Sequence, residues 1–194
     1  MSRIHSTTTA DYLEWDTMLG VVRKLYKDGN YRMSLLIGIG AFTGLRISDI
    51  LSLRWKMLMG ESFILTEKKT GKVREVKINK DFRCHILDCL RALNVLDHDE
   101  YCFISRKQCI YSIQRINAIF KNIKAKYNLK ITHFSTHSLR KTFGRKVVEM
   151  AGANSEMALI KLAELFNHST TQITRRYLGL RKEELMEVYE CLDF

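Results

Sequence analysis

The sequence predicts a mainly helical domain that carries one small antiparallel β-sheet, which is an α+β fold. Three observations lead to this class. The 194 residues include no proline, which favours long helices because proline breaks the helical hydrogen-bond pattern. Apolar residues recur at helical spacing along most of the chain. The period changes to that of strands only between residues 62 and 79.

The first part of the chain is expected to hold three helices. Residues 11–27 place apolar side chains at helical spacing, and residues 28–30 (DGN) follow as a stop signal. Residues 33–42 are apolar on nearly all sides, as expected of a helix buried in a core. A third helix is expected from Ile47 to about Met57.

A hairpin follows these helices. Residues 62–67 and 72–79 are predicted to be two short strands, joined by a turn at residues 69–71 (KTG). Helical spacing returns around residues 82–93 and 113–123, and a loop is expected at about 128–136.

The remaining helices are expected at residues 137–151, 155–166, 170–178 and 181–190. Residues 1–10, rich in Ser and Thr, are interpreted as a tail or the remnant of a linker. No repeat, linker or low-complexity tract interrupts the rest, so residues 11–194 are expected to form a single domain.

The charge of the chain is strongly positive. Lys and Arg number 32 against 21 Asp and Glu, a formal net charge of +11. Such a domain is usually adapted to a polyanion, with nucleic acid as the first candidate; a basic surface kept for solubility is the alternative. Five cysteines without a CxxC pair disfavour a disulfide framework and a structural zinc site. No stretch has the length of a membrane span or the layout of a signal peptide, so we expect a soluble, cytoplasmic protein without a membrane partner.

Several familiar sites can be excluded from the sequence. The chain has no GxxxxGK[ST] loop, no GxGxxG after a strand and no HExxH. The acidic run at residues 97–100 (DHDE) could bind a cation, but a solvated loop is the favoured interpretation. Any phosphate chemistry is therefore expected to proceed without a metal or another cofactor.

Two clusters stand out from the helical background. In residues 43–49 (TGLRISD), a buried helix ends at a glycine and Arg46 opens the next helix, where its fork and free backbone N–H groups suit a phosphate. The alternative is a surface arginine after a capping glycine. In residues 137–143 (HSLRKTF), His137 and Arg140 share one helical face, with Ser135 or Thr136 as the cap. A structural histidine and a solvated arginine are the alternative there.

A third cluster lies near the C-terminus. Residues 165–169 (LFNHS) include His168, and Tyr177 follows nine residues later within the sequence TRRYL. Taken alone, such a tyrosine is more often half-buried packing on a helix than a reactive group.

The order TGLR, HSLRKTF, NHS and RRY resembles the catalytic domain of the tyrosine recombinase (phage integrase) family. The resemblance begins at about residue 12, and its motifs are specific as a set, with 37 residues from Arg140 to Tyr177. One departure is Asn167, where the family usually has glycine; we expect it to be tolerated. The upstream core-binding domain that completes the family's clamp around DNA is absent from this chain, which can therefore be a fragment of a longer protein.

The resemblance implies the fold of that catalytic domain and a site-specific recombinase or integrase. In such an enzyme, Tyr177 would attack the scissile phosphate, form a 3′-phosphotyrosyl link and release a 5′-hydroxyl. A tyrosine suits this role because its phenolate is both a nucleophile and a leaving group. Arg46 and Arg140 would neutralise the non-bridging oxygens. His137 would assist proton transfer from Tyr177, and His168 would donate a hydrogen bond to a phosphoryl oxygen.

The resemblance also implies a lysine in the hairpin that protonates the leaving 5′-oxygen. Lys69, directly before Thr-Gly, matches best, and its neighbour Lys68 does not. Asp49 is expected to support the arginine helix rather than to react. The implied partner is double-stranded DNA, bound by a homotetramer during recombination, whereas the chain alone is expected to be a monomer, associated with the bacterial nucleoid when on DNA. Residues 182–194 are either a segment exchanged between protomers or a tail that packs on its own chain.

Two other functions remain as alternatives. One is a helical DNA-binding module without chemistry, either a regulator or a decayed recombinase; it would explain the charge but not two Arg, two His, a Lys and a Tyr in catalytic order. The other is a type IB topoisomerase, which shares the mechanism but relaxes supercoils. Relaxation of random DNA, set against recombination between specific sites, separates the topoisomerase from the recombinase.

Overall fold

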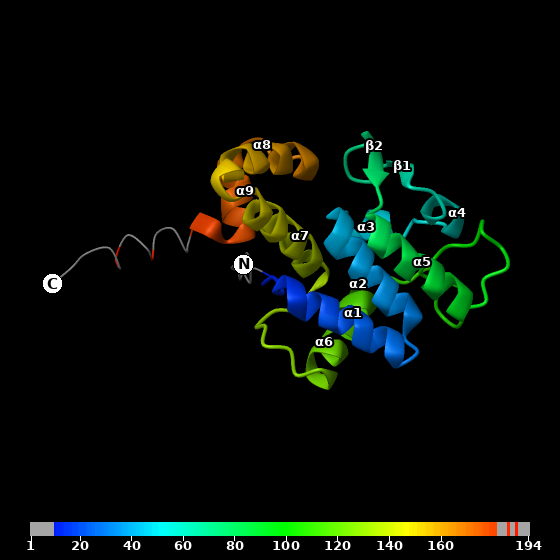
Figure 1. Cartoon of the computed structure of the whole chain (residues 1–194). Helices are drawn as coiled ribbons and strands as arrows, with labels where there is room; N and C mark the ends of the chain where they lie inside the picture. Colours follow the sequence, from blue (N-terminus) through cyan, green and yellow to red (C-terminus); the bar gives the residue numbers. More distant parts are fainter. Residues whose placement is uncertain (1–9, 182–185, 187–188, 190–194) are drawn as a thin grey trace, which may run out of the picture.

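The computed structural model describes residues 10–181 together with Met186 and Tyr189 (Figure 1). Its elements are, in order, α1 (Trp15–Lys27), α2 (Tyr31–Thr43), α3 (Ile47–Ile50), α4 (Trp55–Leu58), β1 (Ser62–Thr66), β2 (Val73–Lys77), α5 (Lys80–Ala92), α6 (Ile113–Lys126), α7 (Thr136–Ala151), the 3₁₀ turn η1 (Gly152–Asn154), α8 (Ser155–Phe166) and α9 (Thr171–Leu178). The predicted class, mainly helical with one small antiparallel sheet, is confirmed.

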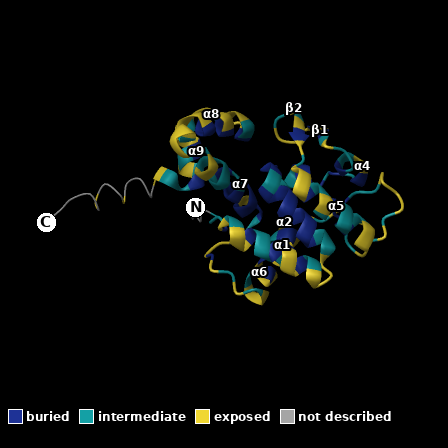
Figure 2. Cartoon of the chain, in the orientation of Figure 1, coloured by how far each residue is buried: buried dark blue, intermediate teal, exposed yellow. Residues whose placement is uncertain are grey.

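Helix α2 is the centre of the larger hydrophobic cluster. It is buried along most of its length, as predicted for residues 33–42, and α1, α5 and α7 pack around it (Figure 2). Two glycines allow this close packing. A Cβ atom at Gly40 would lie 2.5 Å from Leu139 of α7, and one at Gly38 would lie 2.3 Å from Phe82 of α5. The helices that carry the first and second motifs are therefore in direct contact.

The hairpin is close to its predicted position. Strands β1 and β2 pair antiparallel, with Ser62 opposite Lys77 and Thr66 opposite Val73. Phe63 and Leu65 are buried while the residues between them are exposed, the alternation that a half-buried strand requires. This hairpin stands at the edge of the helical body, beside α3 and α4 (Figure 1).

The helix predicted from Ile47 to Met57 is wrong, because the chain breaks it into α3 and α4. Residues 51–54 leave the helical path and pair with the long connection after α5. The Cys102 N–H donates to the Leu53 carbonyl at 2.9 Å, and the Trp55 N–H donates to the Glu100 carbonyl at 3.2 Å. Tertiary pairing with a distant loop thus outweighs local helical spacing, an interaction that periodicity does not register.

Helix α7 joins the two hydrophobic clusters. Near its N-terminus, Leu139 packs in the main core, and further along Phe143 packs against the smaller cluster of α8 and α9. The helices predicted at 137–151, 155–166 and 170–178 are all present, with bounds that differ by at most one residue. The helix predicted at 181–190 lies almost entirely outside the described residues, as do most of residues 1–10 and 182–194.

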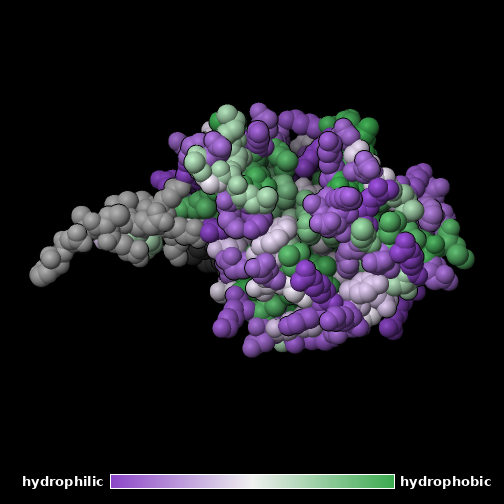
Figure 3. Space-filling model, viewed as in Figure 1, coloured by the Kyte–Doolittle hydropathy of each residue, from purple (hydrophilic) through white to green (hydrophobic). Residues whose placement is uncertain are grey.

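Hydrophilic side chains predominate on the face shown in Figure 3, with hydrophobic ones scattered between them. Among the described helices, none combines the length and the apolar character needed to cross a bilayer.

Candidate functional site

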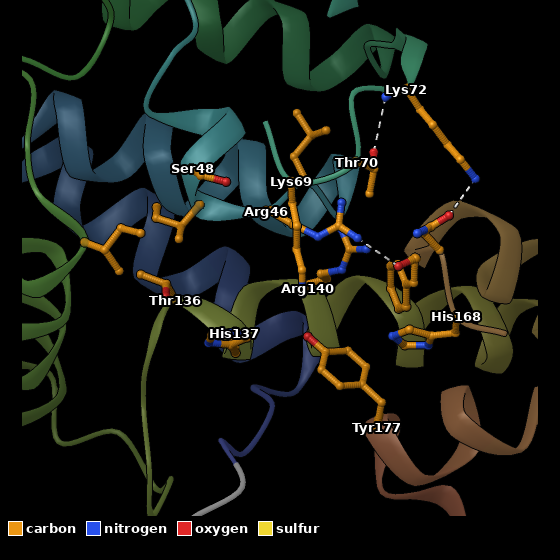
Figure 4. A pocket seen from close by; sticks show the side chains of 15 residues that line it. Arg46, Ser48, Lys69, Thr70, Lys72, Thr136, His137, Arg140, His168 and Tyr177 are labelled. Carbon is orange, nitrogen blue, oxygen red and sulfur yellow. Dashed lines mark hydrogen bonds between the residues drawn. The ribbon is translucent and has the colours of Figure 1, made fainter. Parts of the chain in front are cut away.

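A cavity of about 730 Å³ opens between α3, the hairpin turn, the start of α7 and the α8–α9 pair (Figure 4). Its described lining contains four cationic side chains and no acidic one. All six residues singled out from the sequence line it: Arg46, Lys69, His137, Arg140, His168 and Tyr177. The three sequence clusters and the hairpin turn therefore meet in one place.

Arg46 owes its position to the glycine two residues before it. Gly44 ends α2 in the left-handed conformation, with φ +61°, which favours glycine. A Cβ atom there would also lie 2.4 Å from the ring of Phe143. The chain can thus turn sharply, and Arg46 becomes the N-cap residue directly before α3. Its guanidinium donates to the Phe166 carbonyl at 3.0 Å and to the Glu67 carboxylate at 2.6 Å.

The Arg140 guanidinium is held by a backbone carbonyl and an aromatic ring. Its Nη1 donates to the Gly44 carbonyl at 2.5 Å, and its guanidinium carbon lies 4.1 Å from the centre of the Phe166 ring. Burial, and next the charge of Arg46, lower the pKa of Arg140 to about 10. The side chain therefore remains protonated at neutral pH. The charges of Arg46 and Arg140 repel each other, and an anion between them would relieve the repulsion.

His137 lies in the first turn of α7, one turn before Arg140. Ser135 caps this helix through a capping box with Ser138, so one of the two residues expected as the cap is confirmed. Desolvation, followed by the charges of Arg140, Lys141 and Lys69, lowers the pKa of His137. His137 lines the cavity and is exposed as a residue, so a neutral imidazole is available there at physiological pH.

His168 follows a sharp turn at the end of α8. Asn167 adopts the left-handed conformation, with φ +55°, and the His168 N–H donates back to the Ala163 carbonyl at 2.8 Å. Asparagine is among the non-glycine residues that most readily take this conformation, which agrees with the expectation that Asn167 is tolerated here. The imidazole Nδ1 lies 3.0 Å from the Thr174 hydroxyl, and burial, then Arg140 and Arg46, lower its pKa.

Tyr177 lies on α9, which begins at the Thr170 cap and ends at Gly179. Its ring packs edge-on against Phe166 and His168, with centroids 5.7 Å and 5.4 Å away. The ring is thus fixed in orientation, and the hydroxyl points from α9 toward Arg140 (Figure 4).

The Tyr177 hydroxyl is buried and has no hydrogen-bond partner among the described residues. Burial raises the pKa of Tyr177 to about 12, although Arg140 and Arg46 act in the opposite direction. A buried hydroxyl without a protein partner is costly, so its position at the cavity calls for an explanation.

Lys69 lies in the hairpin turn and not on a strand. Regular pairing ends at Thr66 and Val73, and the Glu67 N–H closes the turn on the Lys72 carbonyl at 2.9 Å. The described lining of the cavity includes Lys69 and Lys72 but not Lys68, whose N–H donates to the Asp49 carboxylate at 2.9 Å. Asp49, which is buried, thus anchors the turn to α3.

Lys72 is a cavity residue that the motifs did not indicate. Its ammonium reaches across to the Asn167 side-chain oxygen at 2.6 Å and so links the hairpin to the end of α8 (Figure 4). Glu67 was also missed, although strand alternation offered a signal: Phe63, Leu65 and Glu67 occupy every second position and are all buried.

The arrangement can bind an anion and deliver a hydroxyl to it. Two arginines, two histidines and a lysine surround the space toward which a phenol points, and this is the set of groups that stabilises charge on a phosphoryl oxygen. In the part of the chain that the structure describes, no three His, Cys, Asp or Glu side chains are grouped so as to hold a metal ion.

Comparison with known proteins identifies the family. Residues 14–184 match the model of the phage integrase family. The chain is 30% identical over 173 residues to the probable integrase/recombinase YoeC of Bacillus subtilis, covering 87% of this chain and 89% of that protein. It is 22% identical over 165 residues to the tyrosine recombinase XerH of Campylobacter jejuni, covering 82% of this chain but 44% of XerH.

Solved structures share the fold. The crystal structure of XerA recombinase superposes with a TM-score of 0.72 at 19% identity, over 96% of this chain and 67% of XerA. The structure of XerH bound to a palindromic DNA substrate after cleavage superposes with a TM-score of 0.66 at 20% identity, over 98% of this chain and 56% of XerH. The arrangement of helices and hairpin described above is therefore that of recombinase catalytic domains.

Proposed function

The chain belongs to the phage integrase family, and from that premise we propose that it cleaves and rejoins double-stranded DNA at specific sites through a 3′-phosphotyrosyl intermediate. The observation that carries this proposal is the convergence of Tyr177, two arginines and two histidines on one cavity whose described lining has no acidic side chain. A packing tyrosine and solvated arginines, the ordinary alternatives, would not need to meet there.

The scissile phosphate would lie between Arg46 and Arg140. Both guanidinium groups are anchored by protein acceptors, Arg46 on the Phe166 carbonyl and Arg140 on the Gly44 carbonyl. Anchored donors need little reorganisation as negative charge builds on the non-bridging oxygens in the transition state. His168, whose Nδ1 is occupied by Thr174, would present Nε2 to one of those oxygens.

Tyr177 would be the nucleophile. With a pKa raised to about 12, it is protonated at neutral pH, so its proton must leave as the bond to phosphorus forms. His137 has the lowered pKa of a base that is neutral at physiological pH. In the balanced step, the Tyr177 oxygen bonds to phosphorus, its proton passes to His137, and the bond from phosphorus to the 5′-oxygen breaks.

The leaving 5′-oxygen would take a proton from Lys69. Lys69 lines the same cavity as Arg46 (Figure 4), and a protonated amine is a suitable general acid for an alkoxide leaving group. Rejoining reverses each step, because the phosphotyrosyl bond conserves the energy of the broken phosphodiester.

Residues 11–194 would act as one catalytic domain, with residues 1–10 as a tail. The assembly that we propose is a homotetramer on double-stranded DNA, formed from chains that are monomeric alone, in the cytoplasm at the bacterial nucleoid. Light scattering of the chain with and without a duplex gives the protein mass per particle. A protein mass that stays at one chain per particle on DNA would contradict this assembly.

Covalent trapping tests the chemistry. A pool of nicked duplexes with randomised sequence beside the nick is incubated with the 194-residue chain, and covalent protein–DNA adducts are isolated. We expect an adduct at Tyr177 in the wild type and none in Tyr177→Phe, which removes the nucleophilic oxygen but keeps the packed ring. Tyr177→Phe should retain DNA binding within about twofold, since it removes no cation. An adduct that persists in Tyr177→Phe, or that maps to Tyr189, would refute the assignment.

Two controls separate the alternatives. Cleavage should survive excess chelator, because Arg46 and Arg140 supply the positive charge that metal ions supply in many nucleases. Relaxation of supercoiled plasmids of any sequence, without recombination between the sites recovered by covalent trapping, would instead indicate a topoisomerase. Binding with no adduct under any condition would indicate a DNA-binding module.

A further inference from the structure

Glu67 has a buried carboxylate that contacts Arg46, one of the residues that line the cavity. It follows β1 directly and is 4% exposed. Its Oε2 accepts from Arg46 Nη1 at 2.6 Å and from the Thr70 hydroxyl at 2.8 Å, while its Oε1 lies 3.6 Å from Arg74 Nη1. A carboxylate here weakens the attraction of the site for a phosphate, so its presence calls for an opposing benefit.

The backbone of the same residue closes the turn that carries Lys69. The Glu67 N–H donates to the Lys72 carbonyl at 2.9 Å, and the Gly71 N–H donates to the Glu67 carbonyl at 2.8 Å. The Thr70 hydroxyl then ties the turn to the Glu67 side chain. One residue therefore contacts both the turn with the proposed general acid and the arginine that would hold the phosphate.

The ion pair also fixes the plane of the Arg46 guanidinium. One terminal nitrogen donates to Glu67 and the other to the Phe166 carbonyl. With both ends held, the guanidinium cannot rotate about its axis, and its remaining N–H groups keep one direction. Burial acts to raise the pKa of Glu67, but the Thr70 hydroxyl and the two arginines outweigh it, so the pKa lies below its ordinary value and the carboxylate stays charged.

We propose that Glu67 is a positioning residue for strand cleavage. Its carboxylate orients Arg46 toward the scissile phosphate and, through Thr70, holds the turn that carries Lys69 in place near that phosphate. The inference rests on the proposed function. It requires that Glu67 act separately on Arg46, which it contacts directly, and on the Lys69 turn, which it reaches through Thr70. Variants can separate these two effects.

The experiment compares two substrates made from the sequence recovered by covalent trapping. One has the ordinary link, and the other has sulfur in place of the bridging 5′-oxygen. A thiolate leaves without a proton, so the sulfur link no longer depends on the placement of Lys69 but still depends on Arg46. The variants are Glu67→Ala, Glu67→Gln and Thr70→Val. The control is Glu75→Gln, on the same hairpin, where an exposed carboxylate accepts only from the Ser62 hydroxyl among the contacts described.

Thr70→Val should cleave the ordinary link about 10- to 100-fold more slowly and the sulfur link at nearly the wild-type rate, because it disturbs only the turn. Glu67→Ala should be slow on both links, about 100-fold on the sulfur link, since Arg46 is then misplaced. Glu67→Gln keeps an acceptor of the same shape and should recover part of the loss. Glu75→Gln should match the wild type on both.

Several results would overturn the inference. If the wild type forms its adduct and folded Glu67→Ala cleaves both links at wild-type rates, Glu67 positions nothing. Faster cleavage by Glu67→Ala would mean that the carboxylate competes with the phosphate for Arg46. Equal losses on both links in Thr70→Val would break the connection to Lys69, and this variant decides the question if Glu67→Ala does not fold. Absence of any wild-type adduct is a different result, because it refutes the proposed function itself.

Discussion

Asn167 shows how one backbone conformation decides which residue types suit a turn at the site. The turn between α8 and His168 requires φ +55°, which costs most L-residues about 1 kcal/mol or more. Asparagine tolerates this region, and its side-chain oxygen also accepts from Lys72. Asn167 therefore both forms the turn and links it to the hairpin.

The three lysines of the hairpin turn have different surroundings despite their closeness in sequence. The Lys68 backbone is bound to Asp49, the Lys72 ammonium is bound to Asn167, and Lys69 lines the cavity and lowers the pKa of His137 after Arg140 and Lys141. Strand alternation does not decide between Lys68 and Lys69, because pairing ends before both.

Lys69→Ala should cleave the ordinary link about 10²- to 10⁴-fold more slowly, the range for loss of a general acid. The substrate with a bridging 5′-sulfur should restore most of the rate, and Lys68→Ala should show neither the loss nor the rescue. Single-turnover cleavage of both substrates measures this. Equal defects on both links would mean that Lys69 only binds DNA, and rescue of Lys68→Ala would identify Lys68 as the acid.

The placement of Tyr177 depends on how closely α9 packs against α7. Gly144 of α7 faces α9, and a Cβ atom there would lie 2.6 Å from Leu178 and 3.2 Å from Phe166. Leu178 is adjacent to Tyr177, and the Phe166 ring packs against both the Tyr177 ring and the Arg140 guanidinium. The helix that carries Tyr177, the proposed nucleophile, is thus located by the absence of a side chain on Gly144 of its neighbour.

Gly144→Ala should therefore lower the free energy of unfolding by about 1–3 kcal/mol through overpacking, and a shift of α9 near 1 Å should slow cleavage about 100-fold. Gly20→Ala is the matched control: Gly20 lies within α1 and a Cβ atom there meets nothing within 4 Å. It should raise stability by about 0.5–1 kcal/mol and leave cleavage unchanged. Urea unfolding and covalent trapping measure both; unchanged cleavage in Gly144→Ala would contradict this account of α9.

Periodicity and motifs predicted most elements because those signals are local. The helix at 155–166 and the hairpin are examples, since burial of one face leaves its period in the chain. The helix predicted at 47–57 failed because its break is caused by pairing with residues 100–102, which lie far away in sequence.

The same distinction applies to the site. The motif residues were found because each stands in a recognisable local pattern, and the structure brings all six to the cavity, while their catalytic roles stay predictions. Glu67 and Lys72 were not found, because their significance arises from partners on other elements, Arg46 and Asn167. Strand alternation could indicate that Glu67 is buried, but it does not identify a partner 21 positions away, and no local pattern marks the pair of Lys72 and Asn167, 95 positions apart.

The stability of the whole protein should fall as pH decreases from about 7.5 to 5.5. Desolvation lowers the pKa of both His85 and His168, so the folded state resists protonation there. The unfolded chain takes up protons as pH falls through about 6.5, the ordinary histidine value. The unfolded state then binds more protons, and the free energy of unfolding drops. Urea unfolding at pH 7.5, 6.5 and 5.5 measures this; His85→Gln should show a smaller drop, and a stability independent of pH would contradict it.

Binding of DNA by the chain should be weak, strongly dependent on salt and nearly independent of sequence. The net charge is +11, and four cations line the cavity where a phosphate would lie. Contacts of this kind release condensed counterions, so the logarithm of the association constant should fall with the logarithm of salt concentration with a slope of about −4 or steeper. Phosphate contacts also carry little sequence information.

Fluorescence anisotropy with two unrelated 30-base-pair duplexes, at salt concentrations from about 50 to 200 mM, measures both the salt dependence and the sequence dependence of binding. Lys72→Ala should reduce the slope by about 1 on either duplex. Tight binding that resists salt, or a large difference between the duplexes, would show that base contacts and not the cavity's cations dominate recognition by this chain.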